Sequence, residues 1–254
     1  METITLEEDE RLDEVNYRVR LIQKTKGLSF GTDALLLAAY MQGKSKAKAL
    51  EIGGGSGIIS LLCLAREKFA QVDCVEIQPA YAKLIQKNIA LNHMEERMHA
   101  HCADIRDYAA DTARRGTIDI VYTNPPYMHT GGAANKHDEK NIARHEIYGS
   151  IGEFCHAAQL LLRYGGKFYC VYRPDRMIDL LCAMRENKLE PKRMTLVHAT
   201  KNATPSMLLV EAIYGGKSGL RLTRPLILYR DNEQNYTEDM EIVMNGGVLP
   251  QAEE

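Results

Sequence analysis

The sequence of 254 residues predicts one α/β domain with a mostly parallel sheet, helices on both faces and an antiparallel pair of strands at one edge. Short apolar runs, typical of buried strands, alternate with segments that carry apolar residues at helical spacing. Strands that alternate with helices need crossover connections, and these make neighbouring strands parallel. Toward the C-terminus two apolar runs follow each other with no helix between them, which indicates an antiparallel pair.

The expected elements follow one another along the chain. An extended basic stretch first gives way to an apolar helix that Thr32 or Asp33 is placed to cap, because a short side-chain oxygen accepts free N–H groups of the first turn. Apolar runs predict strands at 47–52, 71–77, 97–103, 117–123 and 165–173. Helical spacing predicts helices at 58–67, 79–92, 104–109, 150–163 and 174–187, and the antiparallel pair is expected at 190–199 and 205–216.

Composition places the chain among ordinary globular proteins. Hydrophobic residues make up 45% and charged residues 26%, far from disordered or collagen-like sequences. No stretch approaches the roughly 18 to 20 apolar residues of a membrane span, and the N-terminus is acidic where a signal peptide is basic, so we expect a cytoplasmic protein without a membrane partner. The six cysteines form no CxxC pair, which favours reduced core thiols over disulfides or a metal site.

Charge is unevenly distributed along the chain. Residues 1–14 contain seven acidic residues and one basic residue, and residues 231–254 contain seven acidic residues and no basic one. Residues 15–230 contain 31 basic against 20 acidic residues, a net charge of +11. A basic body suits a polyanion such as nucleic acid, because Lys and Arg neutralise phosphates; dispersed lysines that serve solubility explain the charge about equally well. We therefore divide the domain into an N-terminal extension with a cap helix (1–46), a core (47–230) and an acidic C-terminal extension (231–254).

Two features at strand ends predict a binding site for an adenosine group. Glu51 ends the first core strand and is followed by Gly53, Gly55 and Gly57, in a GxGxG frame that does not fit the dinucleotide pattern GxGxxG. Glycines let a ligand approach the backbone at the start of a helix. Glu76, at the tip of the second strand, is placed to accept hydrogen bonds from both ribose hydroxyls, although a strand-end glutamate can also be merely solvated.

Two further residues continue this pattern along the sheet edge. Asp104, after the third strand, is placed to accept from an adenine amino group, or alternatively to cap the next helix. The fourth strand ends in Asn124-Pro125-Pro126-Tyr127, whose prolines fix the backbone as it leaves the sheet. The Asn124 side chain and the Pro125 backbone offer two carbonyl oxygens beside an aromatic ring. Such a set is suited to clamp a planar NH2 group.

With these motifs the chain resembles class I S-adenosylmethionine-dependent methyltransferases that carry an NPPY motif and act on planar nitrogens. FGTDALLLAAYM (30–41), ARHE (143–146), RPDRMIDLL (173–181) and DNEQNYTEDM (231–240) are similar to segments of the tRNA1(Val) (adenine(37)-N6)-methyltransferase family. The resemblance covers almost the whole chain. It implies a Rossmann-like fold with a seven-stranded sheet and a bound S-adenosylmethionine.

The resemblance also implies roles for particular residues. The target amine is held at Asn124, Pro125, Pro126 and Tyr127. The cofactor is held near Thr32, Asp33, Glu51, Gly53, Gly55, Gly57, Glu76, Ile77, Asp104, Ile105 and Asn124. Asp33 can equally act only as a helix cap. No metal is required, because the methyl group is already activated on a cationic sulfur.

The implied reaction is methyl transfer to N6 of adenine in RNA, most simply in a tRNA. Basic residues expected to contact RNA are Lys26, Lys136, Lys140, Arg144 and His145, together with Lys192, Arg193 and Lys201 of a second cluster around the antiparallel pair. Four of them fall in a long polar loop, 128–149, that orders over a ligand or is a disordered insertion. DNA adenine, rRNA guanine, a protein glutamine amide, or cofactor binding without catalysis remain alternatives at this stage.

Overall fold

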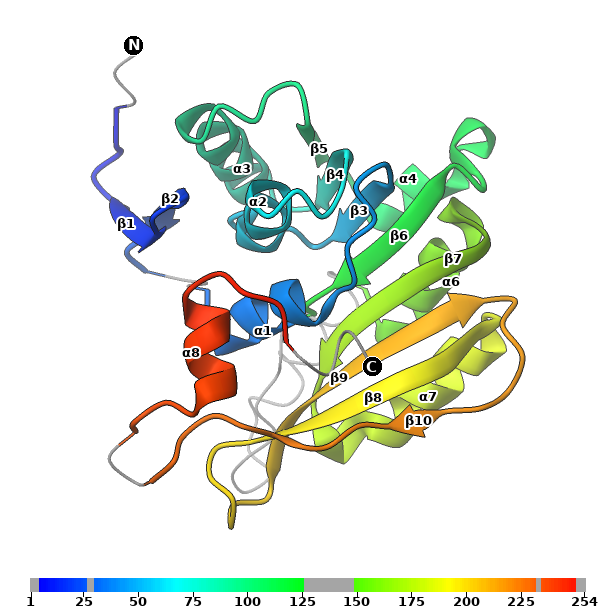
Figure 1. Cartoon of the computed structure of the whole chain (residues 1–254). Helices are drawn as coiled ribbons and strands as arrows, with labels where there is room; N and C mark the ends of the chain where they lie inside the picture. The colour runs from blue at the N-terminus through cyan, green and yellow to red at the C-terminus, as the bar shows by residue number, and fades with distance from the viewer. Residues whose placement is uncertain (1–4, 27–29, 126–148, 232–233, 250–254) are drawn as a thin grey trace, which may run out of the picture.

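The computed structural model describes residues 5–26, 30–125, 149–231 and 234–249 (Figure 1). The strands are β1 (Glu10–Asn16), β2 (Val19–Lys24), β3 (Lys48–Ile52), β4 (Gln71–Glu76), β5 (Met98–Cys102), β6 (Ile118–Thr123), β7 (Leu162–Tyr172), β8 (Leu189–His198), β9 (Pro205–Tyr214), β10 (Arg221–Leu222) and β11 (Leu226–Ile227). The α-helices are α1 (Thr32–Tyr40), α2 (Ile58–Ala65), α3 (Pro79–Leu91), α4 (Ile105–Ala110), α6 (Ile151–Leu161), α7 (Met177–Glu186) and α8 (Glu238–Met244). The strands and helices expected within the core are confirmed.

The central sheet has the order β10-β8-β9-β7-β6-β3-β4-β5, with β11 also paired to β8. The run β7-β6-β3-β4-β5 is parallel, so the carboxyl ends of these strands share one edge. The antiparallel hairpin is confirmed as β8–β9, and β9 also pairs antiparallel with β7. The seven expected strands are therefore present, and two strands of two residues each extend the sheet beyond β8.

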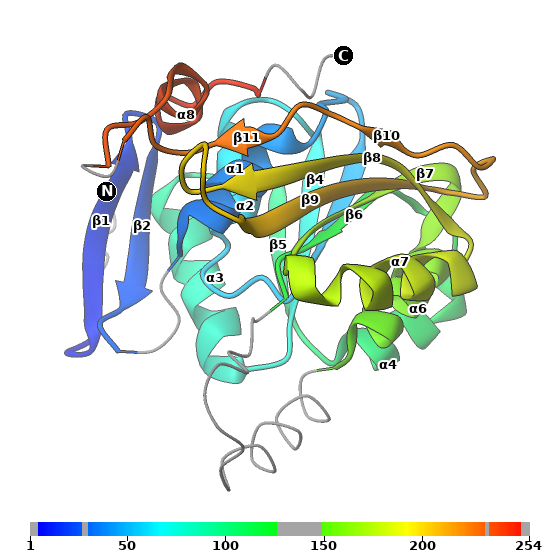
Figure 2. The ribbon, with the colours of Figure 1, turned by 90° about the horizontal axis from the view of Figure 1, so that it is seen from below.

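Helices cover both faces of this sheet (Figures 1 and 2). One apolar cluster joins α1, α2, α3 and α8 to one face, and a second joins α4, α6 and α7 to the other. Parallel strands buried on both faces read as continuous apolar runs, which is why the sequence pattern identifies them. The result is the three-layer arrangement typical of α/β domains.

The beginning of α1 differs from the expectation. The cap position is Gly31, so neither Thr32 nor Asp33 caps the helix with its side chain. Asp33 is the second residue of the helix, and its Oδ1 accepts a hydrogen bond from the Ala34 N–H at 2.9 Å. Its second oxygen is thereby left for a contact outside the helix.

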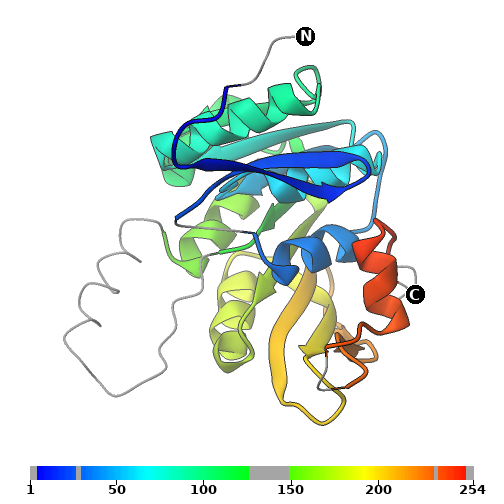
Figure 3. The ribbon, with the colours of Figure 1, turned by 90° about the vertical axis from the view of Figure 1, so that its left-hand side faces the viewer.

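The N-terminal segment forms a β1–β2 hairpin that packs on α3 (Figure 3). The side chains of two asparagines, one in α3 and one at its C-terminal cap, bind the backbone of β2 as a neighbouring strand would. The buried Asn88 side chain accepts from the Ile22 N–H at 2.7 Å and donates to the Ile22 carbonyl at 2.9 Å. Asn92 binds the Arg20 backbone in the same way, at 3.1 and 2.8 Å. The edge of β2 is therefore satisfied by side chains.

Ion pairs also fasten the acidic N-terminus to this helix. Glu7 lies 3.0 Å from the ammonium groups of both Lys83 and Lys87, and Glu10 lies 2.8 Å from Lys87. Hydrogen bonds from Lys83, Lys87 and Lys24 lower the pKa of Glu7 to about 2. Part of the positive charge of the body is thus paired with the acidic end.

The described part of the acidic C-terminal segment belongs to the core. Met240 and Val243 of α8, and Leu249 beyond it, are buried in the cluster that contains α1. The described part of this C-terminal extension therefore packs on the rest of the domain, and its boundary at residue 231 stays a prediction. Leucine- and methionine-type side chains among the acids supply the apolar face that makes this segment pack.

Candidate active site

Four parallel strands bring the predicted residues to one edge of the sheet. Across that edge the strand order β6-β3-β4-β5 places Asn124, Gly53, Glu76 and Asp104 side by side. Register confirms the alignment, because Ile52 pairs with both Thr123 and Val75. Adjacent strands lie about 4.8 Å apart, so this row extends over about 14 Å. An elongated ligand can therefore touch all four strand ends.

The glycine loop separates open positions from packed ones. Gly53 and Gly55 have φ values of 71° and 55°, and a Cβ on either would meet nothing within 4 Å. A Cβ on Gly57 would instead lie 2.9 Å from the Met98 side chain. Gly53 and Gly55 thus leave room above the loop, whereas Gly57 allows α2 to pack closely while it begins in a left-handed conformation.

Glu76 supports this loop from the neighbouring strand. Its Oε2 accepts from the Gly55 N–H at 3.0 Å, and its Oε1 accepts from the Gln78 N–H at 2.9 Å. The side chain is 4% exposed. A carboxylate has about four lone-pair sites, so two are left for the hydroxyls of a ribose. Glu76 is fixed in position before any ligand arrives.

Asp104 is engaged by its own helix. It caps α4 by accepting from the Arg106 N–H at 2.8 Å, and its carboxylate also binds the Arg106 guanidinium. That guanidinium lowers the pKa of Asp104. The capping role is confirmed, and contact with an adenine stays a prediction. Ile77 follows β4 half-buried, and Ile105 begins α4 buried.

Asn124 is the most informative residue of the site. Its Nδ2 donates to Asp33 Oδ2 at 3.0 Å, which joins the end of β6 to the first turn of α1. Its Oδ1 is buried and has no hydrogen-bond partner among the described residues. An unpaired buried oxygen is costly, so this atom is suited to an incoming donor. Pro125, which follows, is buried, and Thr32 is half-buried beside Asp33.

Glu51 lies below the loop, in the core. It is 1% exposed and its carboxylate accepts a hydrogen bond from the Ser60 hydroxyl, which also contacts Tyr122. Burial raises the pKa of Glu51 to about 8. A direct contact between this carboxylate and a ligand stays a prediction, while its place under α2 supports the loop from within.

Of the residues expected to bind RNA, Arg193 is corrected by the structure. It is 3% exposed, pairs with Glu211 at 3.0 Å and donates to the Tyr40 carbonyl at 3.0 Å. It shares the buried face of β8 with Thr195 and Val197, two and four positions further along, and it lies directly opposite Glu211 on β9. Arg193 stabilises the interior and is not part of a docking surface.

The second basic cluster is divided between two edges of the sheet. Lys192 lies near the start of β8 and donates to the Lys217 carbonyl at 3.1 Å. Lys201 is exposed beyond the other end of that strand, at the same edge as Asn124. Lys26 is exposed after β2. Of Lys192 and Lys201, only Lys201 therefore lies at the edge of the sheet that carries the candidate site, three strands away from β6.

Several predicted residues lie outside the described part of the chain. They are Pro126, Tyr127, Lys136, Lys140, Arg144 and His145. Their roles stay predictions.

Sequence reasoning missed Asn88. Its Nδ2 donates to the carbonyl of Ser56 in the glycine loop at 2.9 Å while it also binds Ile22. The signal was helical spacing, because Asn88 shares the buried face of α3 with Leu84 and Leu91. A polar residue at an apolar position of a helix indicates a buried partner.

Two searches of the described residues were negative. No group of three or more His, Cys, Asp or Glu side chains is arranged to hold a metal ion in that part of the chain. No helix in the described ranges is long and apolar enough to cross a membrane.

The described sheet order and the helices on both faces define a Rossmann-like methyltransferase fold. Over 85% of this chain and 97% of the other, the structure is similar to the crystal structure of a predicted O-methyltransferase from Agrobacterium tumefaciens, with a TM-score of 0.69 and 21% identity. It is also similar to the Thermus thermophilus 16S rRNA N2 G1207 methyltransferase in complex with AdoMet and guanosine, with a TM-score of 0.56 and 21% identity over 82% of this chain and 52% of that chain.

Sequence comparison makes the assignment more specific. Residues 24–186 match the Methyltransferase small domain family, and the chain belongs to that family. Among curated proteins it is similar to the tRNA1(Val) (adenine(37)-N6)-methyltransferase of Phocaeicola vulgatus, with 27% identity over 72% of this chain and 76% of the relative. The corresponding Haemophilus influenzae enzyme is 28% identical over 85% of this chain and 89% of the relative.

The chain is therefore an S-adenosylmethionine-dependent N-methyltransferase. The described residues fit this cofactor: the open positions above Gly53 and Gly55 leave a cradle, and Glu76 keeps two acceptor sites beside it. Asn124, whose Oδ1 has no hydrogen-bond partner among the described residues, follows β6, the strand next to β3 on the side opposite Glu76.

Proposed function

We propose that this protein methylates the exocyclic N6 of an adenine in RNA, and that its substrate is the adenine at position 37 of a tRNA of the tRNA1(Val) type. The observation that carries the chemistry is the buried Oδ1 of Asn124, which has no hydrogen-bond partner within the described chain. The curated relatives named above support the choice of polymer and position.

The proposed mechanism is alignment of the amine. Asn124 Oδ1 accepts one N–H of the adenine amino group, so the nitrogen lone pair is directed toward the methyl donor. S-adenosylmethionine, when bound, supplies a methyl group activated on a cationic sulfur. As the nitrogen forms its new bond to carbon, positive charge develops on it, and the fixed carbonyl dipole of Asn124 stabilises that charge. The N–CH3 bond would form as the S–CH3 bond breaks, with the neutral thioether as the leaving group, and the nitrogen would then lose a proton to water.

Asp33 determines which way the Asn124 amide faces. Because Asp33 Oδ2 has no proton to give when ionised, it can bind only the NH2 side of the amide. Rotation of the amide by half a turn would place two oxygens against each other. Asp33 therefore holds Oδ1 toward the target, and it is a positioning residue in this proposal.

The proposed RNA substrate requires the target base to leave its stack. An adenine in an anticodon loop is unpaired, so extraction costs less than it would in a duplex. Lys201 and Lys26, both exposed, are the described residues of the predicted set that remain available to phosphates. We propose a cytoplasmic enzyme that meets the tRNA with this edge of the sheet.

The experiment uses two transcripts that differ at a single position. The protein is incubated with labelled S-adenosylmethionine and an unmodified tRNA1(Val) transcript with adenine at position 37, or its matched variant with guanine there. We expect N6-methyladenosine after nuclease digestion of the first transcript and no label in the second. Label in another nucleoside, or equal label in both transcripts, would contradict the proposed target.

A variant separates catalysis from cofactor binding in the same assay. Asn124→Ala removes the proposed acceptor, so we expect methyl transfer to fall by at least about a hundred-fold, as when a single preorganised dipole is lost from other active sites. Cofactor affinity, measured by calorimetry, should stay within a few-fold. Full activity of this variant would show that Oδ1 does not hold the amine.

Total tRNA from a strain that lacks the gene provides a broader substrate. Methylation of DNA or of a protein glutamine amide in parallel reactions, with none in the tRNA, would assign the site to a different planar nitrogen.

A further inference from the structure

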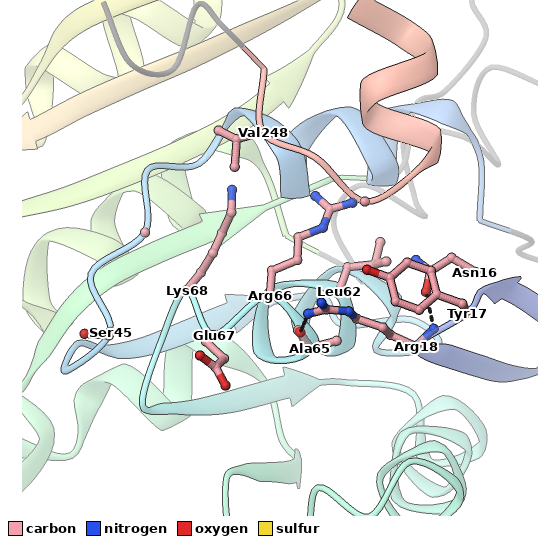
Figure 4. A pocket seen from close by; sticks show the side chains of 12 residues that line it. Asn16, Tyr17, Arg18, Ser45, Leu62, Ala65, Arg66, Glu67, Lys68 and Val248 are labelled. Atoms are coloured by element: carbon pink, nitrogen blue, oxygen red, sulfur yellow. Dashed lines mark hydrogen bonds between the residues drawn. The ribbon is translucent and has the colours of Figure 1, made fainter.

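A pocket lies at the edge of the sheet opposite the candidate active site, where α2 ends. It has a volume of about 500 Å³ and is lined by Tyr17 and Arg18 of the hairpin turn, Leu62 and Arg66 of the α2 end, Lys68, and Val248 near the C-terminus (Figure 4). This volume lies within the range of small-molecule binding sites. The glycine loop is at the other end of α2, so this pocket is separate from the methyl-transfer site.

Arg66 is the unusual group in this pocket. Its Nε and Nη1 are buried and have no hydrogen-bond partner among the described residues, and its Nη2 reaches only the Val243 carbonyl at 3.5 Å. Burial and the nearby charge of Arg18 lower the pKa of Arg66. A guanidinium carries five N–H donors, and leaving buried donors unpaired is costly. Within the described residues, the Nε and Nη1 donors of Arg66 therefore lack a hydrogen-bond acceptor.

The neighbouring charges do not supply that acceptor. Within the described ranges neither Arg18 nor Arg66 forms an ion pair, and Arg18 donates to the Ala65 carbonyl at 2.9 Å. Glu67 lines the pocket but turns its carboxylate away from Arg66 (Figure 4). Two guanidinium groups therefore line the pocket without an ion pair among the described residues.

Lys68 adds positive charge without competing for a ligand. Its ammonium donates to the carbonyls of Ala38 at 2.7 Å, Ala39 at 3.3 Å and Met41, at the C-terminal end of α1. The apolar wall is formed by Leu62 and Val248, and the Tyr17 ring lies 5.1 Å from the Arg18 guanidinium. The pocket thus combines a cationic floor with a partly apolar wall.

We propose that this pocket binds a phosphate group, with Arg66 as the principal ligand and Arg18 as the second. Guanidinium groups pair with phosphate through two parallel hydrogen bonds. A phosphate beside Arg66 would accept from Nε–H and from Nη2–H, which points the same way and now reaches only the Val243 carbonyl at 3.5 Å, while Nη1 would be left to a further acceptor. The phosphate belongs to a small phosphate monoester, with up to two negative charges, or to the RNA backbone, whose phosphodiester carries one; both present non-bridging oxygens that accept from a guanidinium.

Thermal unfolding of the full chain tests the proposal. The melting temperature is measured with 10 mM inorganic phosphate and with sodium chloride of equal ionic strength. For a dissociation constant on the order of 1 mM, we expect phosphate to raise the melting temperature of the wild-type protein by about 3 °C. Arg66→Met should abolish the shift, and Arg18→Met should reduce it.

A matched control carries the same charge change elsewhere. Arg115 is exposed and does not line the pocket, so Arg115→Met should keep the wild-type shift. Without phosphate, Arg66→Met should be at least as stable as the wild type, because it removes a buried charge that has no counter-ion. No shift in the wild type, or the same shift in Arg66→Met and Arg18→Met, would overturn the proposal.

The source of the phosphate is assigned by a binding measurement with a tRNA transcript. If Arg66→Met weakens tRNA binding about ten-fold while Arg115→Met does not, the pocket holds the RNA backbone. If tRNA binding is unchanged and the phosphate shift is lost, the ligand is a free phosphate ester.

Discussion

Replacing Asp33 by alanine removes the group that orients the Asn124 amide. The hydrogen bond between Asn124 Nδ2 and Asp33 Oδ2 is 3.0 Å long and half-buried. A hydrogen bond to a charged group contributes about 1.5–3 kcal/mol. Without it, both amide orientations become accessible, and one of them turns the NH2 group toward the target. At 1.36 kcal/mol for each factor of ten, we expect kcat to fall about ten- to hundred-fold.

Single-turnover methylation of the adenine-37 transcript measures this effect, together with the dissociation constant of S-adenosylmethionine. Asp33→Ala should lower the rate while cofactor affinity changes less than about three-fold. Asp33→Asn keeps an acceptor for Asn124 Nδ2, but as a neutral hydrogen bond worth about 1 kcal/mol. It should therefore restore part of the rate.

Two results would refute this reasoning. A rate within two-fold of the wild type for Asp33→Ala would show that the amide is oriented by other groups. A loss of cofactor affinity equal to the loss of rate, in both variants, would show that Asp33 acts on the cofactor and not on Asn124.

Three further predictions concern the loop and the core. Gly55→Ala and Gly116→Ala both place a side chain at positive φ in open space, so each variant should lose about 1–2 kcal/mol of stability. Only Gly55→Ala should also weaken cofactor binding, by at least about ten-fold in calorimetry. Equal affinities of the two variants for the cofactor would place the cofactor elsewhere. The pKa of Glu51 is raised from 4.5 to about 8, so its contribution to stability is fully present below pH 4.5 and is lost as the pH rises through 8. In urea unfolding, the free energy of unfolding of Glu51→Gln should therefore exceed that of the wild type by up to about 4 kcal/mol at pH 8 and match it near pH 4.5. Parallel pH profiles of the two proteins would contradict this. Glu211→Ala leaves the Arg193 guanidinium buried without its carboxylate and should cost about 3–5 kcal/mol, whereas the double change Arg193→Met with Glu211→Leu should recover most of it; a single variant as stable as the wild type would show that the ion pair is unimportant.

The sequence was sufficient for the fold because buried parallel strands are apolar on both faces. Runs such as 71–77 and 117–123 are short and mostly apolar, and the helices between them carry apolar residues at helical spacing, so the crossover pattern is visible without tertiary information. The order of motifs along the chain then placed Gly53, Glu76 and Asn124 at one edge, since parallel strands end on the same side.

The surroundings of single polar residues were harder to predict from the sequence. Arg193 was expected at a surface because arginine is rarely buried, yet the register of the hairpin sets it against Glu211, 18 residues away. That pairing depends on which residue of β8 faces which residue of β9. A bulge between Pro191 and Arg193 changes this match, and a sequence pattern does not reveal it.

Contacts between distant segments were hidden for the same reason. Asp33 and Asn124 are 91 residues apart, and no local pattern links the start of one helix to the end of a strand. The acidic segment after residue 231 was marked off as an extension by its charge, and that charge does not reveal the packing of Met240, Val243 and Leu249 against the cluster that contains α1.

The Asn88 amide has a practical consequence for defining the minimal enzyme. The stretch that matches the family begins at residue 24, but the buried amide that steadies the Ser56 carbonyl also depends on Ile22, two positions earlier. A protein trimmed to the matched stretch would keep every glycine of the turn, but Asn88 Oδ1 would lose the Ile22 N–H and Nδ2 would retain only the Ser56 carbonyl. The hairpin is thus a structural support for the glycine loop, which it reaches through the Asn88 side chain.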